Sequence, residues 1–185
     1  MKILLHACCG PCASACVPRL RAAGGETALF FSNSNIDTAE EFERRLDSAR
    51  ILARAENTEI IEDRRDHGDW LEKVAKGLED EPERGARCAR CFLYSLGRAA
   101  EYAASHGFDA VASSLTVSPH KSSEAVFAAG EAAVKSRGGG KTAFLREDFK
   151  KRNGFLESCR RAAELGLYRQ QYCGCEFSRR GRMQP

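Results

Sequence analysis

Short apolar runs alternate with longer segments of helical periodicity along almost the whole chain. We predict buried strands at Lys2–Ala7, Thr27–Ser32, Thr58–Ile61, Phe108–Ser113 and Thr142–Leu145. We predict helices at Pro11–Ala23, Thr38–Ala55, Asp66–Leu78, Cys88–His106, Ser122–Lys135 and Asn153–Leu165. Strands joined through helices run parallel, and the helices then cover the sheet. We therefore expect an α/β fold with a five-stranded, mostly parallel sheet and helices on both faces.

The 185 residues suit one α/β domain that spans residues 1–185. From about residue 166 to residue 185 we expect an irregular tail that carries Cys173 and Cys175 and packs at the active site. The apolar start is too short for a signal peptide, and no apolar run approaches the roughly 20 residues of a membrane span. The protein is therefore expected to be cytoplasmic, with no membrane partner.

Nine cysteines are the strongest chemical signal, and seven of them fall in three motifs. In a reducing compartment, clustered cysteines are more often metal ligands or redox thiols than disulfide partners. The motifs are Cys8-Cys9-Gly10-Pro11-Cys12, Cys88-Ala89-Arg90-Cys91 and Cys173-Gly174-Cys175. Cys16 and Cys159 lie singly on predicted helices, and we interpret them as ordinary thiols.

The first motif follows the first predicted strand, at the edge where parallel sheets bind their ligands. Gly10 permits a tight turn, and Pro11 suits the first position of a helix. The helix start favours a thiolate at Cys12.

The other two motifs point to metal or redox chemistry. Cys88 and Cys91 share one face of a helix start, a spacing found in zinc sites, thioredoxin-type thiols and iron–sulfur proteins. A disulfide between Cys173 and Cys175 closes a small strained ring, so this pair suits electron relay or metal ligation. Four sulfurs saturate a zinc ion or a cluster. Seven therefore favour an iron–sulfur cluster together with a second iron, a redox dithiol or both.

Loop residues and charge add weaker candidates. Asp37 follows the second predicted strand and His120 follows the fourth, where either can reach the site, although such residues often only form turns. The net charge of +3 permits contact with nucleic acid without predicting it. Basic residues concentrate between Lys135 and Arg161, where they can meet phosphates or form a solvated face.

The motifs in order resemble those of the QueH-type epoxyqueuosine reductases. The resemblance covers nearly the whole chain, and it rests on the combination of its segments. The matching segments are residues 2–13, Asn33-Ser34-Asn35-Ile36, Arg87-Cys88-Ala89-Arg90-Cys91-Phe92, residues 107–110 continuing to Val117-Ser118-Pro119, Asp148-Phe149-Lys150-Lys151-Arg152 and residues 166–175. This chain departs from the family at Ser34, where proline is usual, and at His120-Lys121, where an aromatic and an amide are commoner.

The resemblance implies the last step of queuosine biosynthesis, the cobalamin-independent reduction of epoxyqueuosine to queuosine at the wobble position of tRNA. It also implies a sheet like that of the adenine nucleotide alpha-hydrolase and PP-loop (HUP) superfamily, with cysteines in place of the phosphate-binding loop. It implies a 4Fe–4S cluster, with a second, mononuclear iron as a further cofactor. An unidentified electron donor is then a partner beside the tRNA.

Site residues carry over position by position. Cys8, Cys9, Cys88 and Cys91 correspond to the cluster positions, with Cys12 competing for a place, and Cys173 and Cys175 correspond to the redox pair. Asp37, His120 or Tyr172 is then a candidate proton donor. The predicted contacts to a single-stranded tRNA loop are Lys150, Lys151, Arg152, Tyr168 and Tyr172. Phe149 suits either base stacking or the core.

Two other functions fit the same residues. A zinc-stabilised nucleic-acid binding module would use the cysteines structurally, without turnover. A thiol–disulfide or sulfur-transfer enzyme would depend on Cys173 and Cys175 alone.

Overall fold

Five strands form one sheet in the order β3-β2-β1-β4-β5, and every neighbouring pair is parallel. The computed structural model describes the backbone of residues 1–182 and the side chains of residues 1–179. The strands are β1 (Lys2–His6), β2 (Glu26–Phe31), β3 (Ile60–Glu62), β4 (Ala110–Ser113) and β5 (Ala143–Phe144). The α-helices are α1 (Gly10–Ala22), α2 (Ala39–Ala55), α3 (His67–Trp70), α4 (Ala86–Ser105), α5 (Ser123–Arg137), α6 (Gly154–Glu164) and α7 (Glu176–Arg182). A π-helical turn η1 (Leu71–Ala75) continues α3, and a 3₁₀ turn η2 (Ser114–Val117) follows β4.

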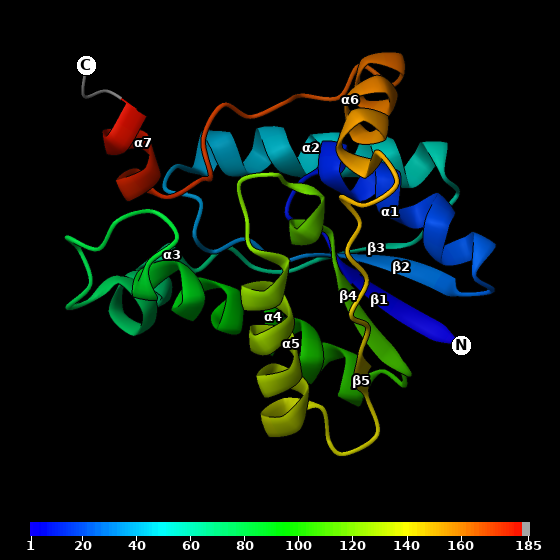
Figure 1. Cartoon of the computed structure of the whole chain (residues 1–185), viewed down its shortest axis with the longest axis horizontal. Helices are drawn as coiled ribbons and strands as arrows, with labels where there is room; N and C mark the ends of the chain where they lie inside the picture. Colours follow the sequence, from blue (N-terminus) through cyan, green and yellow to red (C-terminus); the bar gives the residue numbers. More distant parts are fainter. Residues whose placement is uncertain (183–185) are drawn as a thin grey trace.

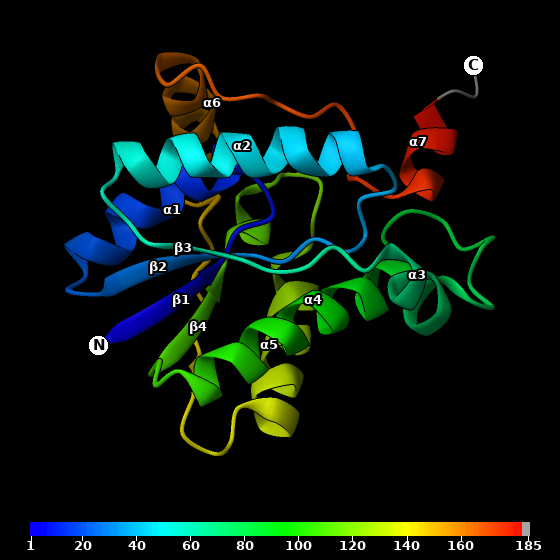
Figure 2. The same ribbon diagram turned by 180° about the vertical axis from the view of Figure 1, so that it is seen from behind.

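The sheet is covered on both faces, which confirms the predicted fold class (Figures 1 and 2). Helices α1, α2 and α6 lie on one face, and α4 and α5 lie on the other. Alternate residues of the central strand β1 serve the two layers. Ile3 and Leu5 pack with Val17 of α1, whereas Leu4 packs with Ala99 of α4. Both faces of β1 are therefore buried, as its unbroken apolar run predicts.

The strand order reverses direction beside β1, and this reversal positions the site. From β1 the chain builds outward through β2 to β3, then returns to place β4 on the other flank of β1. At such a switch point, the connections at the carboxyl ends of the two strands diverge and leave a crevice between them. The order is consistent with the expected superfamily resemblance.

The sheet is entirely parallel, in agreement with the predicted mostly parallel sheet. Two local expectations need correction. The helix predicted from Asp66 to Leu78 is α3 and then η1, ending at Ala75, because Lys76 is extended and Gly77 adopts a positive φ of 76°. The tail is not wholly irregular, since α7 begins directly after Cys175. The last part of the predicted tail, residues 183–185, lies outside the described residues.

Candidate functional site

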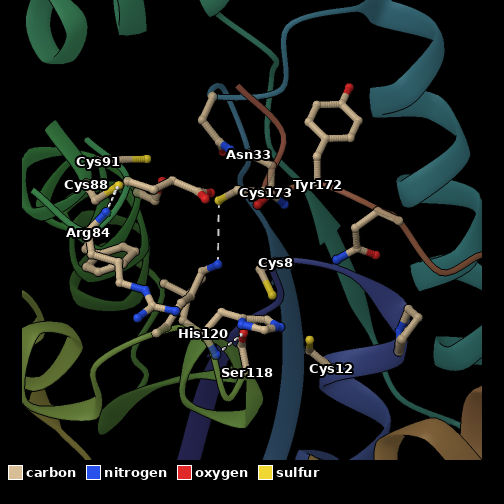
Figure 3. Close-up of a pocket in the computed structure, with 18 of the residues that line it drawn as sticks. Cys8, Cys12, Asn33, Arg84, Cys88, Cys91, Ser118, His120, Tyr172 and Cys173 are labelled. Carbon is tan, nitrogen blue, oxygen red and sulfur yellow. Dashed lines mark hydrogen bonds between the residues drawn. The ribbon is translucent and has the colours of Figure 1, made fainter. Parts of the chain in front are cut away.

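A cavity of about 510 Å³ lies at the carboxyl edge of the sheet, beside the ends of β1 and β4. Five cysteines from all three motifs line it: Cys8, Cys12, Cys88, Cys91 and Cys173. Figure 3 shows them on different walls, carried by segments from the start, the middle and the end of the chain. The fold therefore brings the three predicted motifs to one site. Cys9 and Cys175 do not line the cavity, and both are buried.

The first motif forms a compact group of thiols. The sulfurs of Cys8, Cys9 and Cys12 all lie within 4.8 Å of one another, and the Cys8 and Cys9 sulfurs are 3.9 Å apart. Cys9 is the N-cap of α1, and its sulfur accepts the Cys12 backbone N–H at 3.4 Å. Gly10 lets the turn lie against α2, because a Cβ there would stand 2.5 Å from the Ser48 carbonyl oxygen. Three sulfurs at this spacing can hold a metal ion or one corner of a cluster.

The charge of this group resides first on Cys9. Hydrogen bonds from the Cys12 and Cys8 thiols hold the pKa of Cys9 well below its usual range, against the opposing effect of burial. Side-chain hydrogen bonds with Cys8 and with Cys9, together with burial, raise the pKa of Cys12 well above its usual range. The predicted thiolate at Cys12 is therefore wrong. The helix start stabilises charge at its N-cap position, and the N-cap is Cys9.

Ser114 supports the first motif from the neighbouring strand. Its hydroxyl accepts the Cys8 backbone N–H at 3.0 Å and donates to the Cys8 sulfur at 3.3 Å. Ser114 directly follows β4, whose end lies beside the end of β1. Ser114 can be identified from the sequence, because it directly follows a predicted strand, at the sheet edge where parallel sheets bind ligands.

His6 lies beneath the cavity, at the end of β1. Burial lowers the pKa of His6 to about 4, so its ring is neutral near pH 7. One ring nitrogen lies 3.1 Å from the Ser32 carbonyl oxygen and the other 3.2 Å from the Ser113 hydroxyl. The ring therefore donates to Ser32 and accepts from Ser113, which fixes the end of β1 against its neighbours.

The second motif occupies the first turns of α4. The Arg84 backbone N–H donates to the Cys88 sulfur at 3.2 Å. Cys91 packs against Trp70 and Cys175, and burial raises its pKa. Both thiols face the cavity from the wall made by α4. They are neutral without a metal, and a bound cation would favour their thiolates.

The third motif divides between the cavity and the core. The Cys173 sulfur lies 3.5 Å from the Lys121 ammonium, and the pKa of Lys121 is raised, chiefly by the charge of Cys173. Cys175 is buried with Trp70 and Val74, and burial raises its pKa to about 11. Gly174 between them has a φ of 137°, a conformation that side chains disfavour.

The tail that carries the third motif is fastened to α2. The Arg45 side chain, 2% exposed, is paired with Glu41 and donates to the carbonyl oxygens of Tyr172 and Cys173. Tyr168 donates its hydroxyl to Glu41 at 2.9 Å. These contacts hold the tail against α2.

Asp37 contributes to the same attachment. Its carboxylate accepts the Tyr172 hydroxyl at 2.8 Å and lies 3.1 Å from the Arg179 guanidinium, with its side chain only 5% exposed. Its backbone N–H donates to Gly174. Asp37 is not among the residues that line the cavity. Its contacts favour a role in positioning the tail, whereas its role as a proton donor stays a prediction.

The basic segment predicted to contact substrate does not line the cavity. Lys150 donates its ammonium to the backbone carbonyl of Lys121, so the segment lies next to the cavity wall. Lys151 and Arg152 are exposed, and Arg152 is paired with Glu147. Phe149 is fully buried in the core, so of its two predicted roles, base stacking or core packing, the structure shows core packing.

The remaining expectations concern single cysteines and the membrane. Cys16 packs in the core between the sheet and α1, as an ordinary thiol. Cys159 of α6 does not line the cavity. Within the described residues, no helix combines the length and the apolar character needed to cross a membrane.

The parallel α/β fold with a cysteine-lined cavity at its switch point is consistent with an oxidoreductase, the class to which the matching family belongs. The family model of epoxyqueuosine reductase QueH matches residues 3–181. This chain therefore belongs to the QueH family of epoxyqueuosine reductases.

Individual relatives agree with the family match. Epoxyqueuosine reductase QueH of Streptococcus pyogenes serotype M1 is 37% identical over 96% of this chain and 70% of its own length. The Acinetobacter baylyi protein of that name is 34% identical over 97% of this chain and 81% of its own length. The Thermotoga maritima protein is 30% identical over 95% of this chain and 89% of its own length.

Proposed function

We propose that this protein reduces epoxyqueuosine to queuosine at the wobble position of tRNA, with an iron–sulfur cluster as cofactor. The observation that carries the proposal is the meeting of three cysteine motifs at one cavity, in a chain that belongs to the QueH family. The reaction consumes two electrons and two protons and releases water. Amino-acid side chains other than cysteine supply no such electrons, so a redox cofactor or a dithiol is required.

The donor set fits iron. The thiols of Cys8, Cys9 and Cys12 lie within 4.8 Å of one another, and Cys8 and Cys12 line the cavity that Cys88 and Cys91 face from α4. Thiolates are the usual ligands of iron–sulfur clusters. We propose Cys8, Cys9, Cys12, Cys88 and Cys91 as the set from which a 4Fe–4S cluster takes its ligands. When bound, the cluster supplies electrons singly, at a potential that depends on its surroundings.

The chain's own residues prepare the site for that chemistry. Ser114 orients Cys8, the N-cap position favours charge on Cys9, and the Arg84 N–H orients Cys88. Hydrogen bonds to ligating sulfurs tune a metal site. We propose Cys173 and Cys175 as the redox pair, with the Lys121 ammonium in contact with the Cys173 sulfur.

The substrate reaches this cavity as part of a single-stranded RNA loop. We propose Lys151 and Arg152 as outer contacts to its backbone, since both are exposed beside the cavity wall. Lys150, Tyr168 and Tyr172 shape this region by bonds to the protein itself, through Lys121, Glu41 and Asp37. Tyr172 also lines the cavity, so its ring is available to the base.

The test combines metal analysis with turnover. Protein purified without oxygen is analysed for iron and sulfide, then incubated with epoxyqueuosine-containing tRNA and a chemical reductant. Mass spectrometry of the nucleosides should detect queuosine. Cys9→Ala and Cys88→Ala should lose iron and activity, whereas the matched control Cys159→Ala, outside the cavity, should keep both.

Other outcomes separate the alternatives. A loaded cluster without queuosine would contradict the substrate. Colourless protein with a single zinc ion would favour the nucleic-acid binding module. Loss of activity in Cys173→Ala, with Cys88→Ala merely less stable, would favour the thiol–disulfide enzyme. Iron in excess of four atoms per chain, lowered by Cys173→Ala, would indicate the second, mononuclear iron.

A further inference from the structure

Two arginines that line the cavity have no acidic partner. Arg84 and Arg169 are both exposed, and within residues 1–179 neither guanidinium pairs with a carboxylate. By contrast, Arg45, which also lines the cavity, is paired with Glu41. We infer that Arg84 and Arg169 bind the RNA phosphates that flank the nucleoside inserted into the cavity. This inference rests on the proposed function and deepens it.

Arg84 holds an unusual backbone conformation. Its φ is 74°, in the left-handed region that favours glycine. The chain has a glycine at the next position, Gly85, but the left-handed residue is the arginine. The conformation lets the Arg84 N–H reach the Cys88 sulfur, while the side chain lines the cavity. Figure 3 shows the side chain extending from the Cys88 wall towards the segment with Ser118 and His120. Glycine would suit the backbone better, so the strain favours a function for the guanidinium.

Arg169 enters the cavity from the tail, a different part of the chain. It lies between buried Leu167 and the cavity residue Gln170, and Tyr168 beside it is held by Glu41. Its guanidinium lies 5.8 Å from the ring centre of Phe155, another cavity residue. The backbone around Arg169 is therefore anchored, and the side chain is supported at one end by an aromatic ring.

The remaining charges of the cavity do not neutralise these two groups. Glu83 also lines the cavity and keeps its charge, but within residues 1–179 its carboxylate forms no ion pair with Arg84 or Arg169 and accepts the Ser178 hydroxyl at 2.7 Å. The Lys121 ammonium contacts Cys173. Among the described side chains that line the cavity, the two cations without an acidic partner are thus guanidiniums, whose planar donors match the oxygens of a phosphate.

The number and placement of the two arginines fit a strand rather than a free nucleotide. A nucleoside within an RNA loop has one phosphate on its 5′ side and one on its 3′ side. Arg84 and Arg169 come from separate segments at one cavity, so each can take one of these phosphates while the base enters between them.

The experiment measures binding, separately from turnover. Anaerobically purified protein of known iron content is titrated against a fluorescein-labelled anticodon stem–loop RNA, and anisotropy is followed at several KCl concentrations. The variants are Arg84→Gly, which suits the left-handed backbone and keeps the N–H to Cys88, and Arg169→Gln. The matched control is Arg54→Gln, which also removes an exposed, unpaired guanidinium, at the end of α2 and outside the cavity.

Each cavity variant should raise the Kd about fivefold to tenfold and reduce the slope of log K against log salt by about 0.7, the value for one phosphate on a single strand. Arg84→Lys should bind more tightly than Arg84→Gly. The iron content of the variants should equal that of the starting protein, and Arg54→Gln should leave the Kd and the salt slope unchanged. Binding and salt slope equal to the starting protein would overturn the inference, and so would loss of iron in Arg84→Gly. If the protein binds the stem–loop through these arginines but forms no queuosine, the inference holds and the proposed function fails.

Discussion

Ser114 illustrates how much of this site depends on single side chains outside the cysteine motifs. It satisfies the Cys8 backbone N–H and contacts the Cys8 sulfur, so one hydroxyl controls both the backbone and the thiol. Cys9, the N-cap of α1, also has two roles. Its sulfur accepts a backbone N–H at the start of the helix, and its thiol has a lowered pKa.

Replacing Ser114 with alanine should lower the free energy of unfolding by about 1–2 kcal/mol, because the Cys8 N–H then loses its partner in a part-buried place. Urea unfolding of metal-free protein measures the change. Ser136→Ala, which removes an exposed hydroxyl from α5, serves as the control and should change stability little. Equal stability of Ser114→Ala and the starting protein would show that water replaces the hydroxyl.

At this scale, the sequence predicts the cysteines of the site but not Lys121. The cysteines stand out because their spacing has few structural explanations. Lys121 does not, since a lysine in a loop is usually solvated, and only the folded tail brings Cys173 within 3.5 Å of its ammonium. The sequence also does not locate the thiolate, because the choice between Cys9 and Cys12 depends on which of them is the N-cap of α1.

At the scale of elements, α1 approaches α2 closely at its first residue. Gly10 permits it, since a Cβ would stand 2.5 Å from the Ser48 carbonyl oxygen. That oxygen belongs to the backbone of α2, so one helix must move as a unit if a larger residue stands at position 10.

Gly10→Ala should therefore lower the free energy of unfolding by about 1–3 kcal/mol through overpacking, and it should also disturb the adjacent thiols. Thermal or urea unfolding gives the first effect, and iron content after anaerobic purification gives the second. Gly68→Ala is the control, because a Cβ at Gly68 meets no atom within 4 Å. Wild-type stability and iron content in Gly10→Ala would mean that α1 and α2 separate easily.

The elements themselves are largely predictable, and the failures have physical causes. The five strands and the long helices follow from strong apolar periodicity. The sequence does not predict helix α7, because Phe177 is the only large apolar residue of its first turn and no periodic pattern marks the helix. The early end of η1 depends on the left-handed Gly77, which periodicity does not reveal.

At the scale of the whole molecule, the site depends on a tail that crosses back to α2. Buried Arg45 is the main link, since it pairs with Glu41 and donates to two tail carbonyls. No local sequence pattern connects position 45 with residues 172 and 173. This part of the arrangement could not be predicted, because it depends on tertiary contacts.

Arg45→Met should lower the free energy of unfolding by about 3–5 kcal/mol, because it leaves the Glu41 carboxylate buried without its cation. The double variant Glu41→Gln with Arg45→Met should recover much of that loss. Hydrogen exchange of residues 168–175 should remain faster in both, since the tail carbonyls have lost their donor. Arg50→Met, which removes a half-exposed guanidinium from the same helix, should leave the exchange of the tail unchanged. Slow exchange in the double variant would show that other contacts hold the tail.

The position of Cys173 in the chain has a consequence for biogenesis. The cavity receives one of its five thiols from residue 173, whereas the first comes from residue 8. During translation, the ribosome must therefore release nearly all of the described chain before the two can meet. Completion of the five-thiol cavity is then a late event, and a nascent polypeptide stalled after α6 would expose the other four thiols to oxygen and stray metals.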